Sequence, residues 1–460
     1  MPDGASQSQV RLSSIIESTR GTTPASPAYN INRILSGSFL QVDKNFEQSN
    51  EINSTRDPGA RVGGVAGCSG TISMPLVKDV GWEHWGESAL SGVFTALAPS
   101  AITGTWATAG DTFTRASGSF LTASPATRFE IGDMLFAAGT TNNQTQLNGA
   151  MADTTGTTAT VDTVDATTIS NATGYIKIDN EIMAYTGRTS TSFTGLTRGA
   201  LGTTAATHAD NAPVLIGRTI TNITATVLTF ANDQTVNESS VSTTFTTNVR
   251  VLVPGTTRAF YSVEQHFADK SLYEIFKGVE VNTMGVNVPT SGEITTEFAV
   301  LGTSYATGQV ASSTYTAANT KSPFAGSVSG SVLTLNGAAL GTWLESLTVN
   351  VNNNRALKYG VGEQFACFVE EGTRQIDLSF AAYLVDLTLQ GYFQAETRFS
   401  MFFTSVSADG DRYQFVFPRL VLTAAPKGVS GQTIVENYSA SAEKDSTSNS
   451  AFWMREVTRS

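Results

Sequence analysis

Residues 57–76 read DPGARVGGVAGCSGTISMPL and concentrate glycine in front of a short alternating segment. A phosphate-binding glycine loop follows a strand and opens a helix, so that backbone N–H groups and the positive helix end meet the phosphate. Here the glycines lead into TISMPL, which alternates as a strand does and contains Pro75, and no Gly-Lys-Ser/Thr ending is present. The stretch therefore indicates a flexible or bulged strand connection in which neighbouring backbones approach closely.

The segments on both sides of this stretch have regular patterns. FLQVDKNFEQSNEIN and GTISMPL are extended segments joined by an Arg/Asp/Pro/Gly connection, which predicts a long β-hairpin over residues 41–76. Beyond it, residues 78–98 place Trp82, Trp85 and Ala89 on one helical face. This spacing predicts a helix.

The rest of the chain divides by composition. Residues 99–254 are rich in Thr with Asn, Asp and Gly between short runs, which predicts an inserted small all-β domain. Residues 255–460 alternate in longer runs bounded by turns, which favours an antiparallel sandwich or barrel. Within them, DKSLYEIFKG is a candidate for a second helix ending at Gly278. The predicted fold class is mainly β: a β-sandwich or barrel from residues 1–98 and 255–460, with one short flanking helix and the inserted domain.

Charge and cysteine content exclude several classes of protein. The 460 residues hold 28 Lys and Arg against 39 Asp and Glu, a net charge of −11, so a protein that grips the DNA backbone through clustered cations is not expected. Cys68 and Cys367 lie too far apart in the sequence for a metal motif, and two cysteines make no disulfide framework. The first residues do not resemble a secretion signal, and no apolar window reaches about 18 residues, so we expect a cytoplasmic location and no membrane contact.

The sequence offers little catalytic chemistry. His84, His208 and His266 stand in unrelated segments without ligand spacing, and no Gly-x-Ser-x-Gly elbow is present. Asp409 and Asp411 in ADGDRY could hold calcium, but the same letters are typical of a tight hairpin turn, which we favour. No catalytic residue, cofactor or metal ligand is predicted, and we expect that the protein is not an enzyme.

Carboxylates in strand-like segments leave three interpretations open. In the first interpretation, two of these carboxylates converge on a sugar as in a glycosidase. In the second, the carboxylates form a solvated face of a sheet. In the third, they form an acidic surface that does not retain DNA. The sequence alone does not choose between these. The residues are Glu47, Glu51, Glu264, Glu293, Glu297 and Glu396.

An ordered set of segments at both ends of the chain resembles the major tail tube proteins of long-tailed bacteriophages. The segments are ESTRGTTPASPA, QSNEINSTRDPGARVGGVAGCSGTISMPL, YSVEQHFADKSLYEIFKGVEVNTMGVNV, LTVNVNNNRALKYGVGEQFACFVEEGTRQIDLSFAAYL, DGDRYQFVFPRLVLTAAPKGVSGQTIVENYSASAEKD and the terminal WMREV. Residues 99–254 depart from the minimal pattern, and GYIKIDNEIMAYTGRTSTSFTGLTRGALGTTAATHADNAPV within them is similar to small β modules of phage tail and adsorption proteins.

The resemblance implies a structural virion protein that forms homo-hexameric rings stacked into a tube, with DNA as transient, non-specific cargo. It further implies a tape measure protein inside the tube during assembly, and tail terminator and distal tail proteins at the tube ends. The inserted domain is expected to face outward, which favours a non-contractile tail. The alternative is a tail-tip or adhesin-like β protein that binds the host cell surface.

Two sets of candidate site residues follow from these implications. The connection around the glycines is expected to contact the next ring, and the acidic residues are expected to line the lumen and repel DNA. The inter-ring candidates are Arg56, Asp57, Gly59, Arg61, Gly63, Gly64 and Gly67; the lumen candidates are Glu47, Glu51, Glu293, Glu297 and Glu396.

Overall fold

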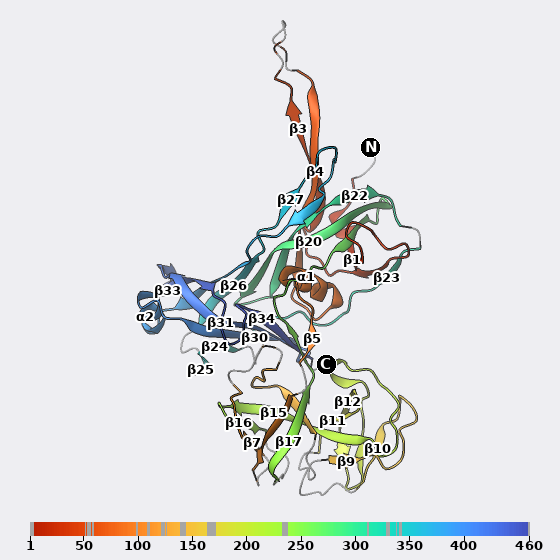
Figure 1. Ribbon diagram of the computed structural model, residues 1–460, viewed down its shortest axis with the longest axis vertical. Helices are drawn as coiled ribbons and strands as arrows, with labels where there is room; N and C mark the ends of the chain where they lie inside the picture. The colour runs from red at the N-terminus through yellow and green to blue at the C-terminus, as the bar shows by residue number, and fades with distance from the viewer. Residues whose placement is uncertain are drawn as a thin grey trace. The chain divides into compact units, whose positions relative to one another are not determined.

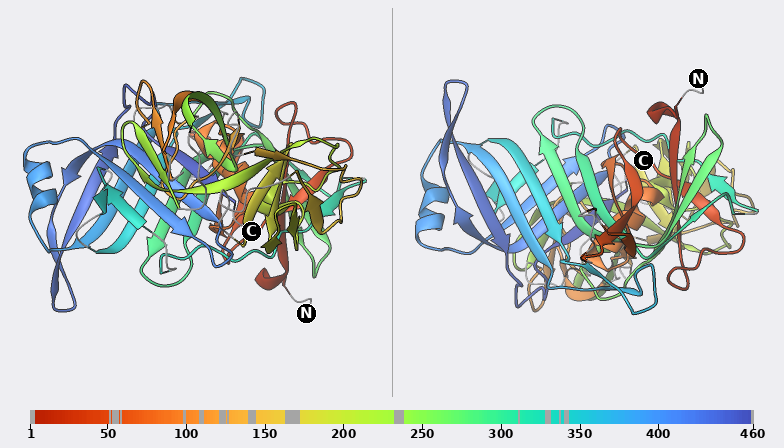
Figure 2. Two further views of the ribbon diagram at one scale, coloured as in Figure 1. Left: turned by 90° about the horizontal axis from the view of Figure 1, so that it is seen from below. Right: turned by 90° about the horizontal axis from the view of Figure 1, so that it is seen from above.

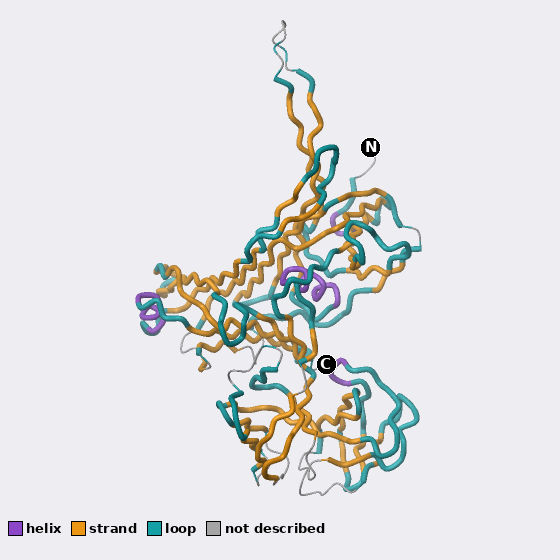
Figure 3. The backbone as a smooth tube through the Cα atoms, in the orientation of Figure 1, coloured by secondary structure: helices purple, strands orange, loops and turns teal. Residues whose placement is uncertain are grey.

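The computed structural model describes residues 4–50, 52, 57, 59–97, 100–107, 111–120, 125, 127–138, 144–162, 172–231, 238–310, 312–327, 332–336, 338–339 and 343–458. The chain is mainly β, as predicted (Figure 3). It divides into two compact units. The first unit is Met1–Phe94, Leu252–Ala408 and Phe415–Lys444; the second unit is Thr95–Val251, Asp409–Gln414 and Asp445–Ser460.

The elements of the first unit come from both ends of the sequence. They are η1 (Gln7–Gln9), β1 (Val10–Ile16), β2 (Ala28–Ile31), β3 (Phe39–Gln48), β4 (Arg61–Pro75), α1 (Val80–Leu90), β19 (Tyr261–Phe267), β20 (Leu272–Pro289), β21 (Thr295–Gly302), β22 (Ser304–Thr307), β23 (Thr314–Thr316), β24 (Val332–Leu335), β25 (Ala338–Ala339), β26 (Leu344–Asn352), β27 (Ala356–Lys358), β28 (Phe368–Glu370), β29 (Gln375–Tyr383), α2 (Thr388–Gln394), β30 (Phe399–Val406), β32 (Lys427–Ser430) and β33 (Thr433–Ala442). Strand β31 (Arg412–Ala424) contributes to both units.

A broad antiparallel sheet organises the first unit. Neighbouring strands pair in the order β3–β4–β21–β20–β26–β29–β33, and we call this the main sheet (Figure 2). One face is apolar because alternate residues such as Ile72, Phe298 and Met284 are fully buried. Helix α1 packs against this face, with the rings of Trp82 and Trp85 centred 6.4 and 6.3 Å from that of Phe298. The sheet therefore has one buried face and one that the described elements leave half-buried or exposed.

Helix α1 lies within the predicted range but is shorter. It ends at Leu90 because Ser91 adopts a left-handed conformation, with φ of 50°, and the N–H of Gly92 bonds back to the carbonyl of Glu87 at 3.1 Å. The predicted hairpin over residues 41–76 is confirmed as β3 and β4.

The prediction of a second helix over DKSLYEIFKG is wrong. This segment forms the start of β20, which pairs with β19 on one edge and β22 on the other. Gly278 has a positive φ of 60°, but it stands at an irregularity in the strand, where its N–H donates to the carboxylate of Glu17 at 3.0 Å. Strand pairing with sequence-distant segments therefore overrides the local helical spacing.

The described part of the second unit consists of strands and one 3₁₀ helix. They are β5 (Thr95–Ala96), β6 (Ser100–Trp106), β7 (Thr112–Arg115), β8 (Met134–Ala138), β9 (Gln144–Gln146), β10 (Thr158–Thr160), β11 (Gly174–Ile178), β12 (Glu181–Tyr185), β13 (Gly187–Arg188), β14 (Ser192–Thr194), β15 (Pro213–Ile223), β16 (Val227–Phe230), β17 (Glu238–Thr247), β18 (Val249–Leu252) and β34 (Trp453–Val457), with η2 (Ala200–Gly202).

Buried ion pairs and aromatic rings hold the second unit together. Trp106 packs against Phe113, with ring centres 5.0 Å apart. Arg455, on the last strand, is fully buried and donates from Nη2 to Asp133 Oδ2 at 2.6 Å. The predicted domain limits 1–98, 99–254 and 255–460 stay a prediction, because compactness does not establish that one unit was inserted into the other.

Candidate functional site

A projecting hairpin is the most distinctive part of the first unit. Strand β21 stops pairing with β4 at the Gly302–Cys68 pair, whereas β3 continues to pair with β4 as far as Arg61. The described residues 42–50, 52, 57 and 59–67 therefore extend past the end of the main sheet, and we call them the arm (Figure 1). An isolated two-stranded ribbon has marginal stability in water, so such an arm requires support at its base.

The arm exposes apolar side chains. Phe46 is 56% exposed and Val62 is 62% exposed. The ammonium of Lys44 lies 5.4 Å from the centre of the Phe46 ring. Apolar groups gathered on a projecting segment are typical of a surface that contacts a partner.

A second hairpin supports the base of the arm. It consists of β27, β28 and the connecting residues 359–367, and we call it the brace. Ala66 forms a parallel bridge with Phe365, and its N–H donates to the carbonyl of Gln364 at 2.7 Å. The brace thus adds backbone pairing to β4 just beyond the point at which the main sheet ends.

Gly67 permits this contact. A Cβ atom at this position would lie 2.9 Å from Leu357 Cδ1 and 2.9 Å from Tyr359 Oη, which is closer than Cβ atoms are found to other atoms. The brace can approach β4 because this residue has no side chain.

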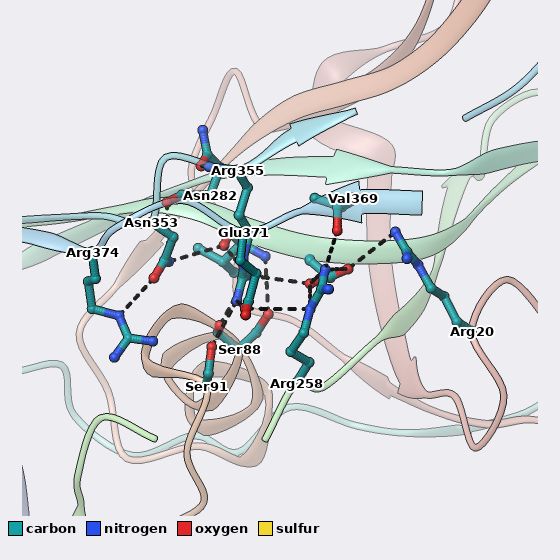
Figure 4. Close-up of polar contacts among 12 residues, drawn as sticks. Arg20, Ser88, Ser91, Arg258, Asn282, Asn353, Arg355, Val369, Glu371 and Arg374 are labelled. Carbon is teal, nitrogen blue, oxygen red and sulfur yellow. Dashed lines mark hydrogen bonds and ion pairs between the residues drawn. The ribbon is translucent and has the colours of Figure 1, made fainter. Parts of the chain in front are cut away.

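A buried ionic cluster fixes the root of the brace (Figure 4). The carboxylate of Glu280 on β20 is fully buried and accepts hydrogen bonds from Arg258 Nη2 at 2.6 Å and Nε at 2.9 Å. Arg20 and Arg355 approach the same carboxylate at 3.5 and 3.7 Å, and Arg355 also donates to Glu371 at 3.3 Å. Burial lowers the pKa of Arg355, and the charges of Glu280 and Glu371 oppose that shift.

The same cluster joins the brace to helix α1. Arg355 Nη2 donates to Ser91 Oγ at 2.8 Å, and Asn353 Nδ2 donates to the carbonyl of Ala89 at 2.9 Å. Both side chains satisfy groups at the C-terminal end of the helix, where donors and positive charge are favourable. Arg374 holds Asn353 in place through a 2.8 Å hydrogen bond to its Oδ1 atom.

The solvent-facing side of the main sheet carries polar residues without a cation. Cross-strand neighbours form one continuous row, Ser73, Glu297, Gly285, Asn350, Asp377 and Ser441. We call the face that contains this row the outer face. Its described members include no Lys or Arg. They include Ser69, Thr71, Ser73, Thr295, Glu297, Ala299, Thr283, Gly285, Asn287, Ser346, Thr348, Asn350, Asn352, Gln375, Asp377, Ser379, Asn437, Ser439 and Ser441. The apolar residues Phe39, Pro75, Pro289, Leu301 and Ala381 lie on the same face, towards its ends.

The inter-ring candidates lie in or next to the arm. Arg61, Gly63 and Gly67 belong to strand β4 and pair with β3, and Gly64 stands on β4 at an irregularity of this pairing, so these residues form a hairpin arm and not an open loop. Asp57 and Gly59 lie between the two strands, and Arg56 lies outside the described residues. Their contact with another ring stays a prediction.

The described lumen candidates come from different parts of the first unit, and their role stays a prediction. Glu297 is on the outer face, Glu47 is exposed in the arm, and Glu51 lies outside the described residues. Glu293 precedes β21 and bridges to Ala325, whereas Glu396 occupies a turn after α2 with φ of 49°. The alternation of the sequence QIDLSFAAY, in which Asp377 falls between buried Ile376 and Leu378, could have identified Asp377 as the second carboxylate of the outer face.

These features describe a structural β protein with a projecting arm and a cation-free polar face. The chain matches the family model described as phage tail tube protein over residues 7–443, and it therefore belongs to this family. A comparison with curated proteins found no significant match. The family is a structural one and not an enzyme family, and it places the chain in the virion tail. Among the described residues, no helix is long and apolar enough to cross a membrane.

Proposed function

We propose that the chain forms rings that stack into the tail tube, and that the outer face of the main sheet lines the channel for DNA. The observation that carries this proposal is the face itself: six paired strands present Ser, Thr, Asn and Gln with the carboxylates of Glu297 and Asp377. Polymerisation of identical copies is consistent with membership of the family.

Open strand edges support ring formation. Strand β3 pairs with β4 on one edge, and the printed register of the described strands gives no strand partner for its other edge, where the N–H of Leu40 donates to the side chain of Gln265 at 3.1 Å. An unpaired edge presents N–H and C=O groups that recruit another strand, and joining such edges head to tail around a rotation axis closes a barrel. We propose six copies per ring, as the family resemblance implies.

The chemistry of the outer face suits DNA passage. Proteins grip DNA by placing Lys and Arg against phosphates, with release of counterions. A wall of small polar side chains without cations offers no such contact, and Glu297 and Asp377 add repulsion. Glu47, Glu293 and Glu396 remain candidates for the lumen at other levels of the tube.

The remaining partners follow from this arrangement. We propose that the tape measure protein occupies the lumen during assembly in the host cytoplasm, and that tail terminator and distal tail proteins cap the ends. The second unit is proposed to face outward as a decoration of a non-contractile tail. The arm, with Asp57, Gly59, Arg61, Gly63 and Gly64, is proposed to contact the next ring.

Electron microscopy and DNA binding test the proposal together. Purified protein should form hollow tubes, and sedimented tubes should retain almost no labelled DNA at low salt. Glu297→Lys or Asp377→Lys should leave tubes intact but retain DNA in a salt-dependent manner, because each places a cation on the wall. Asp162→Lys, at an exposed position in the second unit, is the matched control and should behave as the wild type. A protein that stays monomeric under all conditions and binds host cells would contradict the proposal and support the adhesin alternative.

A further inference from the structure

A second group of exposed apolar residues lies in the first unit, away from the arm. Trp343 is 80% exposed, and four aliphatic side chains on adjacent segments are exposed as well. A cluster of this kind on a soluble protein marks an interaction site more often than a random surface does. We call these residues the end patch; they are Trp343, Val385, Leu387, Val429 and Ile434.

Backbone contacts show that the segments that carry the end patch are neighbours. The N–H of Tyr383 donates to the carbonyl of Trp343 at 3.0 Å, and the N–H of Leu384 donates to the carbonyl of Ile434 at 3.1 Å. Val429 on β32 lies opposite Ile434 on β33. The patch therefore runs across the neighbouring ends of β26, β29, β33 and β32.

The end patch and the arm lie at opposite ends of the main sheet. The arm leaves β4 beyond Cys68. The cross-strand row that begins at Pro75 runs through Thr295, Asn287, Thr348, Ser379 and Ser439, and the patch lies beyond this row, on the side away from the arm. Figure 1 shows the arm at the top of the picture, and β33 and α2 far from it at the left. One surface on each of two opposite ends is the arrangement that heterologous, head-to-tail association requires.

We propose that the end patch binds the arm of another copy of this chain. This proposal rests on the ring stacking proposed above, and in it the end patch is the surface that the arm contacts on the next ring. Phe46 and Val62 supply the apolar groups of the arm, and the patch offers an apolar surface to cover them.

Tryptophan quenching provides a direct measurement. The chain has five tryptophans, and Trp82, Trp85, Trp106 and Trp453 are at most 1% exposed, so acrylamide should quench Trp343 selectively. In tubes the quenching constant should fall severalfold, and a tube-free Phe46→Ser/Val62→Ser variant should retain the monomer value. Unchanged quenching of Trp343 in well-formed tubes would overturn the inference.

Cross-linking between two different copies identifies the occupant. In a Cys367→Ser background, one copy carries Phe46→Cys and the other carries Leu387→Cys; the mixed tubes should give a disulfide-linked dimer upon oxidation. Leu272→Cys, at an exposed apolar position at the start of β20, is the control partner and should give no dimer. Tubes without the Phe46–Leu387 cross-link would refute the acceptor while leaving the tube intact, whereas failure of the wild type to form tubes would refute the proposed function itself.

Discussion

Replacing Gly67 by alanine tests whether the brace holds the arm. The new Cβ atom would stand 2.9 Å from Leu357 Cδ1 and 2.9 Å from Tyr359 Oη, so both side chains must move. Overpacking of this kind costs about 1–3 kcal/mol, and because Leu357 is only half-buried we expect a value near 1 kcal/mol.

The assay is hydrogen exchange at Ala66, whose N–H bonds to Gln364 in the brace. A loss of about 1 kcal/mol in closing the brace corresponds to an exchange rate about fivefold faster. Gly285→Ala is the matched control, because a Cβ there meets nothing within 4 Å. That control should be neutral or stabilising by about 0.4–1 kcal/mol, since alanine restricts the unfolded chain.

A compensating change makes the test specific. Leu357→Ala removes the atom that collides with the new methyl group, so the double variant should recover part of the protection at Ala66, as measured by a double-mutant cycle. Equal exchange in the wild type and Gly67→Ala, with no coupling to Leu357, would show that Gly67 is not what lets the brace approach.

Three further results are expected. Glu280→Gln should lower the free energy of unfolding of the first unit by about 3 kcal/mol, because it removes the buried carboxylate shared by Arg20, Arg258 and Arg355 and leaves the part-exposed Glu371 as the remaining acid beside the buried Arg355. Glu370→Gln, at the exposed pair with Lys358, should change the free energy of unfolding by less than about 1 kcal/mol, and a denaturant titration that ranks the two variants alike would contradict the role of the cluster. Burial raises the pKa of Glu181, but hydrogen bonds from Arg198, Ala206, Gly199 and His208 outweigh burial and lower the pKa to about 2. Because the pKa of Glu181 in the folded protein lies below its ordinary value of 4.5, the ionised carboxylate stabilises the fold fully above pH 4.5, and this stabilisation is lost as the pH falls towards 2. Thermal unfolding of the second unit should show this loss between the two pH values, and the Glu181→Gln variant should not show it. Burial also raises the pKa of Cys68 to about 12, so a thiol reagent should label Cys367 alone in the native protein and both cysteines after denaturation; rapid native labelling of Cys68 would disprove its burial.

The arm and the main sheet could be predicted to different extents from the sequence. Alternation over residues 41–76 identified the hairpin, because a period of two is a local property. The same local reasoning wrongly predicts a helix at residues 269–278. The apolar residues there have helical spacing, but pairing with β19 and β22 makes the segment a strand. The correct and the wrong prediction differ only in the pairing with strands that are distant in the sequence, which a local pattern does not contain.

The charged cluster and the brace could not be predicted in the same way. Glu280 meets Arg20, Arg258 and Arg355, which come from three separate segments, and no spacing in the sequence relates them. Glu297 was correctly placed among strand carboxylates, but its neighbours across the outer face depend on register, which sequence alternation alone does not fix. The alternation of its own strand places Asp377 on the outer face, whereas its neighbours Asn350 and Ser441 could not be predicted from the sequence.

The second unit has a consequence for the timing of folding. It gathers Thr95–Val251, Asp409–Gln414 and Asp445–Ser460 into one body, and the buried Arg455 reaches Asp133 from the last of these segments. Because a ribosome makes the chain from the N-terminus, more than three hundred residues are synthesised after Asp133 before its partner Arg455 is made. A nascent chain therefore completes the interior of this unit only after Arg455 has been made, and excision of residues 95–251 would leave Arg455 without its carboxylate partner.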